Sequence, residues 1–566
     1  MKIALVSTYT HPVALGLRHI SSYLKTAGHD VEMIFMGSKR DTVEADFSDA
    51  ALEQLVERLR ERELIGMSLM TNNFRRACAL TQHVRAAGLK TPIVWGGTHP
   101  TVAPEESLEH ADAICRGEGE EPTLQLVEQL EAGRDPTTIA GFGFRGGGRF
   151  GNRETIRNPC APLETNLDRL PFPDYELETH WVAQKQGLVP ARPGNLRGAL
   201  HILRVVTSRG CPNRCTFCNN AGLRNLFKDC GPWLRLRSLD NVLSEIRLAL
   251  ACFPTIERVN FVDDLFFVRS EDQIEEFVTK YNEQVRLPLQ MDAFPNTVSE
   301  RKVRALAKVP IELISMGIES ASEDTLKSVY RRPTPPKRIA QAIATFKKHR
   351  IRTEYHYIVS NPYEPDRNVI ETMRFIADHH QGHAVLRVFP LKFYPGTPLY
   401  ERARADGLIG TRDDAAYDYM GTGALEFIGH DYLAIWLRIV LNLRNVGVPP
   451  WFAHRVIDFA TNRIVRRAID RRWFPPAVFH GYQVLRKLGR NFIYQPFVRP
   501  VKRLRRKARS KAHRSADEVT RPPPRWTVPR VDSQTWRRGP GGPVSAPDER
   551  AQHPSGTSLS GTPSEK

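Results

Sequence analysis

The run Thr207-Ser-Arg-Gly-Cys-Pro-Asn-Arg-Cys-Thr-Phe-Cys-Asn219 places three cysteines, Cys211, Cys215 and Cys218, in one short loop. Their spacing is C-x3-C-x2-C, and the loop follows the apolar run 202–206. Three thiols this close cannot all pair as disulfides, but three thiolates can bind three irons of a four-iron cluster. Such clusters are normally held by four cysteines, so the fourth iron would stay open to a substrate or cosubstrate.

A structural zinc site is the alternative interpretation of these cysteines, with Cys230 as the fourth ligand. Cys230 lies beyond a stretch with a helical pattern, and no second pair of cysteines two residues apart follows the loop. Structural zinc sites usually contain such pairs. The pattern therefore favours the iron–sulfur cluster.

The composition is that of a globular protein of several domains in a reducing compartment. Hydrophobic residues make up 41% of the 566 residues, and no run of 18 apolar residues predicts a membrane-spanning helix. The apolar start at residues 1–6 is too short for a signal peptide and is predicted as a strand. Eight cysteines, three of them in one metal-type loop, fit a cytosol better than a disulfide framework. We therefore expect a cytoplasmic protein.

The net charge of +18 belongs to the C-terminal part of the chain. Residues 431–566 contain 27 Lys or Arg and 9 Asp or Glu, whereas the first 430 residues contain 54 of each sign. Basic segments of this kind usually meet phosphate in lipid headgroups or nucleic acid. The body of the protein is thus predicted to be neutral. The basic C-terminal part either contacts phosphate or forms a helical cap on the body with a solvated basic tail.

Residues 1–135 alternate short apolar runs with helical patterns, which predicts an α/β domain with a doubly wound, Rossmann- or flavodoxin-like parallel sheet. Ligands of such sheets bind at the carboxyl ends of the strands. The expected strands are 3–6, 31–35, 64–68, 93–95 and 113–114, and the expected helices are 15–27, 50–61 and 75–87.

The remaining chain divides into four further segments. Residues 136–200 are rich in Gly and Pro and are predicted as a linker. In residues 201–410 apolar runs again alternate with helical patterns, which predicts a partial (β/α)6 barrel. The carboxyl ends of its strands would lie together at one mouth of the barrel. Its expected strands are 202–207, 258–262, 289–293, 313–316, 353–359 and 385–393. Residues 411–505 predict a basic helical region, and residues 506–566 predict a disordered tail.

The three-cysteine loop resembles the cluster motif of the radical S-adenosylmethionine (SAM) superfamily. The resemblance implies that Cys211, Cys215 and Cys218 hold a 4Fe-4S cluster whose open iron binds SAM. One electron, from a flavodoxin- or ferredoxin-type donor, then cleaves the SAM sulfonium and usually gives a 5′-deoxyadenosyl radical. Phe217 matches the aromatic position that lies beside the adenine in that family.

Three N-terminal runs, at residues 12–16, 95–101 and 115–122, resemble the cobalamin-binding domain fused to one branch of radical SAM enzymes. The resemblance implies that Ser68, Gly96 and Gly97 hold the corrinoid, with His99 in the same run as a further candidate. The D-x-H-x-x-G loop of the wider family is absent around His11. Cobalamin would then bind without an imidazole below the cobalt. A scaffold whose glycines only form turns is the open alternative.

Two barrel motifs add candidate cofactor-binding residues. Residues 260–267 resemble the F-x-D-D-x-F run of this branch, which would direct Asp263 and Asp264 towards the barrel mouth. Residues 317–322 resemble its G-[IV]-E-S element, so that Glu319 would hold the ribose or amino group of SAM. A solvated strand end and a helix N-terminus are the respective alternatives.

The resemblance covers residues 1–410 and implies a cobalamin-dependent radical SAM enzyme, a C-methyltransferase acting on a small organic substrate. A radical SAM cyclase without methyl transfer, and a non-catalytic cobalamin- or membrane-binding protein with a structural metal, remain open. The aromatic, basic helices of the C-terminal region allow peripheral contact with the inner membrane face and a hydrophobic substrate. Nucleic acid is not an expected partner.

Overall fold

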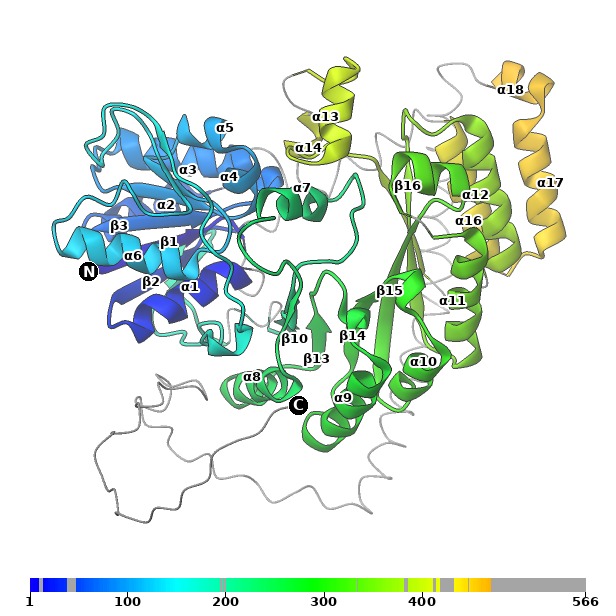
Figure 1. Cartoon of the computed structure of the whole chain (residues 1–566), viewed down its shortest axis with the longest axis horizontal. Coiled ribbons are helices and arrows are strands. Elements are labelled where there is room, and N and C mark those ends of the chain that lie inside the picture. The colour runs from blue at the N-terminus through cyan, green and yellow to red at the C-terminus, as the bar shows by residue number, and fades with distance from the viewer. Residues whose placement is uncertain are drawn as a thin grey trace, which may run out of the picture.

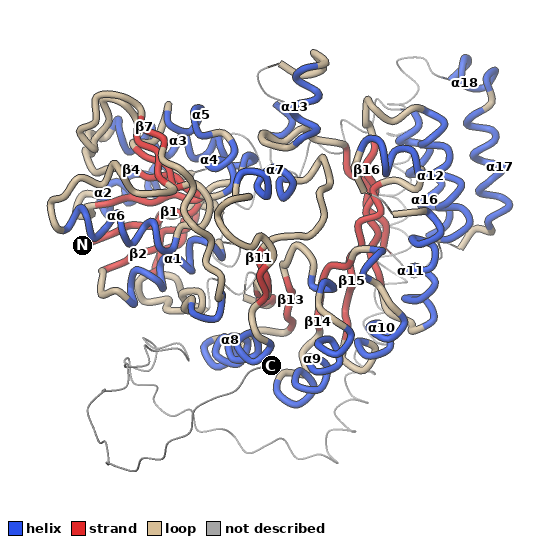
Figure 2. The backbone as a smooth tube through the Cα atoms, in the orientation of Figure 1, coloured by secondary structure: helices blue, strands red, loops and turns tan. Residues whose placement is uncertain are grey.

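The computed structural model describes residues 1–9, 14–37, 47–193, 196, 200–332, 334–380, 385–410, 414–417, 432–445 and 447–469. Two separate sheets, each covered by helices, form the body of the protein (Figures 1 and 2). The predictions for His11, for residues 470–505 and for the tail at 506–566 lie outside the described residues.

The N-terminal sheet has nine strands in the order β7-β6-β5-β4-β3-β1-β2-β8-β9. Its parallel centre has the order 2-1-3-4-5, which is that of a flavodoxin-like doubly wound sheet. The central strands are β1 (Lys2–Ser7), β2 (Asp30–Phe35), β3 (Leu64–Ser68), β4 (Ile93–Gly96) and β5 (Ala113–Cys115). The predicted fold of this domain is therefore confirmed, with strand boundaries within two residues of those expected.

Both faces of this sheet are buried because its strands are apolar at successive positions. Ile3 and Leu5 pack with α1 (Leu15–Thr26) and α6 (Glu120–Glu131), whereas Ala4 and Val6 pack with helices on the opposite face. Those helices are α2 (Asp49–Leu59), α3 (Phe74–Ala86), α4 (Thr98–Val102) and α5 (Pro104–Leu108).

The segment predicted as a linker contributes four strands to this sheet, so that prediction is corrected. The strands are β6 (Phe142–Phe144), β7 (Ile156–Arg157), β8 (His180–Gln184) and β9 (Gly187–Pro190). They lie towards the two edges, where short strands tolerate neighbouring Gly and Pro. Between them Asp174 is buried, accepts a hydrogen bond from Ser21 at 2.6 Å and lies 2.9 Å from Lys25 Nζ, which ties the segment to α1.

The second sheet is entirely parallel, in the order β10-β13-β14-β15-β16-β17, and confirms the partial barrel. Its strands are β10 (Ile202–Val205), β13 (Arg258–Phe261), β14 (Leu289–Ala293), β15 (Ile311–Glu319), β16 (Thr353–Val359) and β17 (Val385–Pro390). Its outer face packs on α8 (Leu239–Cys252), α9 (Glu271–Gln284), α10 (Glu300–Leu306), α11 (Pro336–Lys348) and α12 (Asp366–His379), as Figure 1 shows.

Shorter elements lie near the open end of the barrel and between the strands. They are β11 (Ser208–Arg209), β12 (Arg235–Leu236), α7 (Asn219–Leu226), α13 (Pro398–Ala405) and α14 (Asp414–Tyr417). Single turns occur at Thr71–Asn73, Leu167–Arg169, Phe266–Val268, Pro295–Thr297 and Thr325–Val329.

Three helices of the C-terminal region lie outside the barrel, where the first two pack against α12 and the third packs against the second (Figure 1). They are α16 (Tyr432–Asn445), α17 (Pro450–Thr461) and α18 (Arg463–Ile469). Among the helices that the structure describes, none is long and apolar enough to cross a membrane.

Candidate functional site

The three cysteines lie in the loop between β11 and α7, at the carboxyl end of β10. The loop begins at Gly210, whose φ of +87° is in the left-handed region that favours glycine. A Cβ at this position would clash with the carbonyl oxygen of Trp233. Glycine is therefore the only residue that fits at the start of the cysteine loop without rearrangement of its neighbours.

Asp263 holds the start of this loop. Its carboxylate accepts hydrogen bonds from the backbone N–H and the hydroxyl of Thr207 and, at 3.1 Å, from the N–H of Ser208. The guanidinium of Arg269 lies 3.8 Å away. Burial raises the pKa of Asp263, and the Thr207 and Arg269 interactions offset part of that shift. The carboxylate thus positions the cysteine loop, and its role in cofactor binding stays a prediction.

Asp263→Ala is expected to destabilise the protein by about 3 kcal/mol, because it leaves the buried Arg269 and two loop N–H groups without their acceptor. Thermal unfolding of the full chain and iron content after reconstitution measure the effect. The matched control is Asp272→Ala, which removes an exposed partner of Arg301 and should change neither. Unchanged unfolding and iron content in Asp263→Ala would show that Asp263 does not hold the loop.

Each cysteine sulfur accepts a hydrogen bond from a polar side chain. Asn213 Nδ2 donates to Cys211 at 3.6 Å, Asn220 Nδ2 to Cys218 at 3.8 Å, and Arg332 Nη1 to Cys215 at 3.8 Å. Asp264 accepts from Asn220 at 2.8 Å and so orients one of these donors. The second carboxylate of the pair therefore also acts on the loop.

The donor set fits an anionic cluster. Burial raises the pKa of all three thiols, that of Cys218 to about 12, and an ionised Cys215 raises the pKa of both neighbours further. Cationic iron removes this penalty, because thiolates are the form that binds metal. Within the described ranges, no three His, Cys, Asp or Glu side chains are spaced to hold a single metal ion. A four-iron cluster takes each thiolate on a different iron.

Glu319 lies beside Arg332, which contacts the cysteine loop, and Phe217 belongs to that loop. Arg332 Nη1 is 3.8 Å from Glu319 Oε1, and its other nitrogen donates to the carbonyl of Gly317. Glu319 has a φ of +68°, rare for a residue with a side chain, and burial raises the pKa of its carboxyl group. Phe217 contacts Tyr330 edge-on, with ring centroids 5.0 Å apart. A buried carboxyl group on a strained backbone, as at Glu319, is typical of functional sites.

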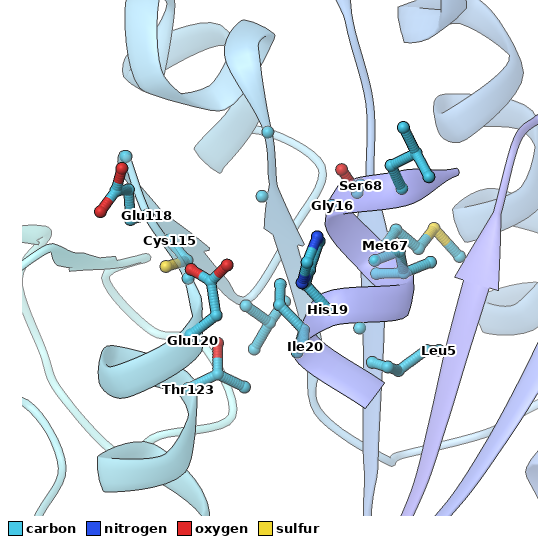
Figure 3. A pocket seen from close by; sticks show the side chains of 18 of the residues that line it. Leu5, Gly16, His19, Ile20, Met67, Ser68, Cys115, Glu118, Glu120 and Thr123 are labelled. Atoms are coloured by element: carbon cyan, nitrogen blue, oxygen red, sulfur yellow. The ribbon is translucent and has the colours of Figure 1, made fainter. Parts of the chain in front are cut away.

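A cavity of about 280 Å³ lies at the carboxyl end of the N-terminal sheet, between α1, the strands and α6 (Figure 3). Ser68, Gly96 and Gly97 all line it. Gly97 has a φ of +95°, and a Cβ there would lie 2.7 Å from the carbonyl oxygen of Leu69 and 2.9 Å from Ser68 Oγ. The glycine-lined cavity fits a slender substituent of a corrinoid, such as its nucleotide tail.

His19 also lines the cavity, and sequence reasoning missed it. Its Nδ1 lies 3.2 Å from the carbonyl oxygen of Pro171, and burial lowers its pKa to about 4. The imidazole is therefore neutral at pH 7, and Figure 3 shows it across the cavity from Cys115 and Glu120. A lone histidine on an amphipathic helix gives no sequence signal that separates a cavity residue from a core residue.

His99, the further candidate for cofactor binding, is not among the residues that line this cavity. Its fully buried ring packs on Phe74, with centroids 4.6 Å apart, and on Tyr417 at 5.6 Å. Its Nδ1 lies 3.2 Å from Thr71 Oγ1. Because the short helix α4 begins directly after Gly97, its first turn directs His99 into the core on the far side of the sheet from α1.

His99→Gln is expected to make the protein less sensitive to acid. Burial lowers the pKa of His99 from 6.5 to about 3, so only the unfolded chain takes up this proton as the pH falls below 6.5. The contribution of the neutral imidazole to the free energy of unfolding is complete above that pH and is lost progressively towards pH 3, by about 2 kcal/mol at about pH 5. Urea unfolding at neutral pH and near pH 5 should therefore show a smaller loss of stability in the variant than in the wild type. An equal loss in both proteins would contradict the assignment.

An ion-pair network joins the cavity to the cysteine loop. Arg209, two residues before Cys211, lies 2.5 Å from Glu120 and 3.2 Å from Glu118. Arg235 of β12 also pairs with Glu118, at 2.8 Å. Arg209 itself lines the cavity, so the two candidate cofactor sites share a wall. The sequence showed these charges near glycines and cysteines but gave no indication that they pair across two domains.

Two family models match the chain: the B12 binding domain over residues 1–127 and the radical SAM superfamily over residues 205–376. An uncharacterised methyltransferase of Pyrococcus horikoshii is 26% identical over 71% of this chain and 81% of that protein. An anaerobic magnesium-protoporphyrin IX monomethyl ester cyclase of Synechocystis is 24% identical over 64% of this chain and 67% of that protein.

Solved structures share the arrangement of both domains. The radical SAM methyltransferase TsrM from Kitasatospora setae, with cobalamin and a 4Fe-4S cluster bound, has a TM-score of 0.55 at 18% identity, covering 72% of this chain and 75% of that one. The cobalamin-dependent radical enzyme OxsB has a TM-score of 0.59 at 16% identity, covering 86% and 75%. This chain belongs to the cobalamin-binding branch of the radical SAM superfamily, whose cofactors are cobalamin, SAM and a 4Fe-4S cluster.

Proposed function

We propose that this enzyme transfers a methyl group to an unactivated carbon of a small organic substrate. The observation that carries the proposal is the wall shared by the cavity and the cysteine loop, through Arg209 and its pairs with Glu118 and Glu120. Methyl transfer needs a methyl carrier close to the place where the substrate is activated. The methyltransferases among the similar proteins agree with this function.

When bound, the cluster and SAM would supply the radical that activates the substrate carbon, and cobalamin would supply the methyl group, with a second SAM as its source. Cys211, Cys215 and Cys218 would hold the cluster, with Asn213, Asn220 and Arg332 donating to their sulfurs. Glu319 and Phe217 are proposed to hold SAM, and Ser68, Gly96 and Gly97 to hold the corrinoid. The surrounding barrel would exclude water from the reaction.

A ring-forming cyclase is the second candidate, favoured by the similarity to magnesium-protoporphyrin ester cyclases over 64% of this chain. It would use the same cluster and SAM site but add no carbon to the substrate. Product mass separates the two functions, because only methyl transfer adds one methyl group per turnover.

Anaerobic purification with added cobalamin, followed by iron, sulfide and corrinoid analysis and a SAM-cleavage assay, tests the proposal. Bound cluster and corrinoid with release of 5′-deoxyadenosine and S-adenosylhomocysteine would support it. A cluster and SAM cleavage without corrinoid would favour the cyclase. The absence of iron after reducing reconstitution would leave the non-catalytic protein with a structural metal. A flavodoxin- or ferredoxin-type reductant is the proposed electron donor.

Peripheral membrane contact is proposed for the outer face of α17 and α18. Trp451, Phe459 and Ile464 are 66%, 52% and 79% exposed there, and the exposed Arg455 and Arg463 lie among them. Aromatic and basic side chains together suit an anionic membrane surface. Cosedimentation with phosphatidylglycerol vesicles, weakened by Trp451→Ser with Phe459→Ser but not by Leu408→Ser, would support this. Equal sedimentation with phosphatidylcholine would contradict it.

A further inference from the structure

The inner face of the barrel is polar, whereas its outer face is apolar. Leu203, Val259 and Leu289 point outwards into the core under the helices. Side chains alternate along a strand, so the residues between and after them line the inner face. On adjacent strands these are Arg204, Asn260 and Gln290, and the strand register pairs Arg204 with Asn260 and Asn260 with Gln290.

Arg204 differs from the other arginines of these six strands. Arg258 pairs with Glu312 at 2.7 Å, and Arg387 pairs at 2.7 Å with Glu354, which His356 also contacts. Arg204 has no carboxylate or hydrogen-bond partner in the described part of the chain, and burial alone lowers its pKa. A half-buried guanidinium loses hydration without gaining a counter-ion.

The side chains at the same level of the next two strands also have no partner. Asn260 and Gln290 are half-buried, and neither side chain forms a hydrogen bond within the ranges that the structure describes. Arg204, Asn260 and Gln290 thus lie in a row on three adjacent strands of the inner face, and each side chain carries N–H donors. Such donors match the oxygens of a carboxylate or phosphate, which a guanidinium can bind through two parallel hydrogen bonds.

We infer that Arg204, with Asn260 and Gln290, binds an oxyanionic group of the substrate, a carboxylate or a phosphate, on the inner face of the barrel. The inference rests on the proposed function, because it takes the barrel interior as the reaction chamber. Arg204 lies on β10, the strand that leads into the cysteine loop, whereas Glu319 ends β15. An anionic group held at Arg204 would fix one end of the substrate and so determine which of its carbons reaches the mouth of the barrel.

Protection of Arg204 from phenylglyoxal tests the inference in the full-length protein, using simple anions as probes. Inorganic phosphate, acetate and chloride are compared at equal ionic strength, and peptide mass spectrometry follows the modification of each arginine. Phosphate or acetate at saturation is expected to slow the labelling of Arg204 by about fivefold or more, because the anion occupies most of the sites. Protection by phosphate alone indicates a phosphorylated substrate, and protection by acetate alone indicates a carboxylate.

The exposed Arg247 of α8 is the internal control, and its labelling should not depend on the anion. Asn260→Ala and Gln290→Ala should each weaken the protection several-fold without removing the guanidinium. Equal labelling of Arg204 in all three salts, or equal protection by chloride, would overturn the inference. SAM cleavage by the wild type is measured separately. If SAM is cleaved and no anion protects Arg204, only the assignment of Arg204 as the oxyanion-binding residue is wrong. If SAM is not cleaved, the proposed function is wrong.

Discussion

Cys215→Ser is expected to abolish cluster binding and to lower SAM cleavage by at least about a thousandfold, since the cluster would be the group that passes the donor's electron to SAM. The side chain is 8% exposed, and Ser nearly matches it in shape, so the fold should persist. A hydroxyl at this position is a far poorer ligand for iron than a thiolate. Iron and sulfide per chain, the visible absorbance of the reconstituted protein and release of 5′-deoxyadenosine measure the effect.

Cys230→Ser is the control that separates the cluster from a structural zinc site. In a zinc site with Cys230 as fourth ligand, this substitution would remove metal as effectively as Cys215→Ser. Cys230 Sγ instead contacts the carbonyl oxygen of Cys160, at 3.8 Å. We expect wild-type iron content and SAM cleavage in Cys230→Ser, and loss of metal in this variant would reject the three-cysteine cluster.

Gly16→Leu is expected to prevent corrinoid binding while leaving the protein folded. Gly16 lies on α1 and lines the N-terminal cavity, and a Cβ there would meet no atom within 4 Å. The leucine side chain would fill part of the roughly 280 Å³ of the cavity. Replacing a helical glycine also favours the helix, by up to about 1 kcal/mol. Corrinoid bound per chain should fall at least about tenfold, with unchanged or higher thermal stability.

Thr26→Leu, an exposed substitution at the other end of α1, is the control and should retain corrinoid. SAM cleavage should persist in Gly16→Leu because the cysteine loop is untouched, whereas methyl transfer should be lost with the corrinoid. Retention of wild-type corrinoid binding in Gly16→Leu would mean that the cofactor does not use this cavity. Loss of corrinoid with continued product formation would favour the cyclase.

The predictions that succeeded rest on signals contained in short stretches of sequence. The alternation of apolar runs and helical patterns predicted both parallel sheets, because buried parallel strands need apolar residues on two faces. Ser68, Gly96 and Gly97 could be placed together because strand ends of one sheet share an edge. The strands within residues 136–200 could not be predicted in this way, since a strand as short as β7, at Ile156–Arg157, has no detectable apolar periodicity.

Sequence by itself determined the doubly wound domain, the six-stranded barrel and the family to which the cysteine loop belongs, because repeating apolar patterns and short motifs are local properties. Only the tertiary structure decided that Asp263 holds the loop, that His99 lies in the core, and that Arg332 reaches a sulfur 117 residues away. It also decided that Arg209 pairs with Glu120 and that Arg204 has no counter-ion among the residues that the structure describes. Such contacts depend on how distant elements pack. The sequence around a charged side chain does not indicate which distant residue it will contact.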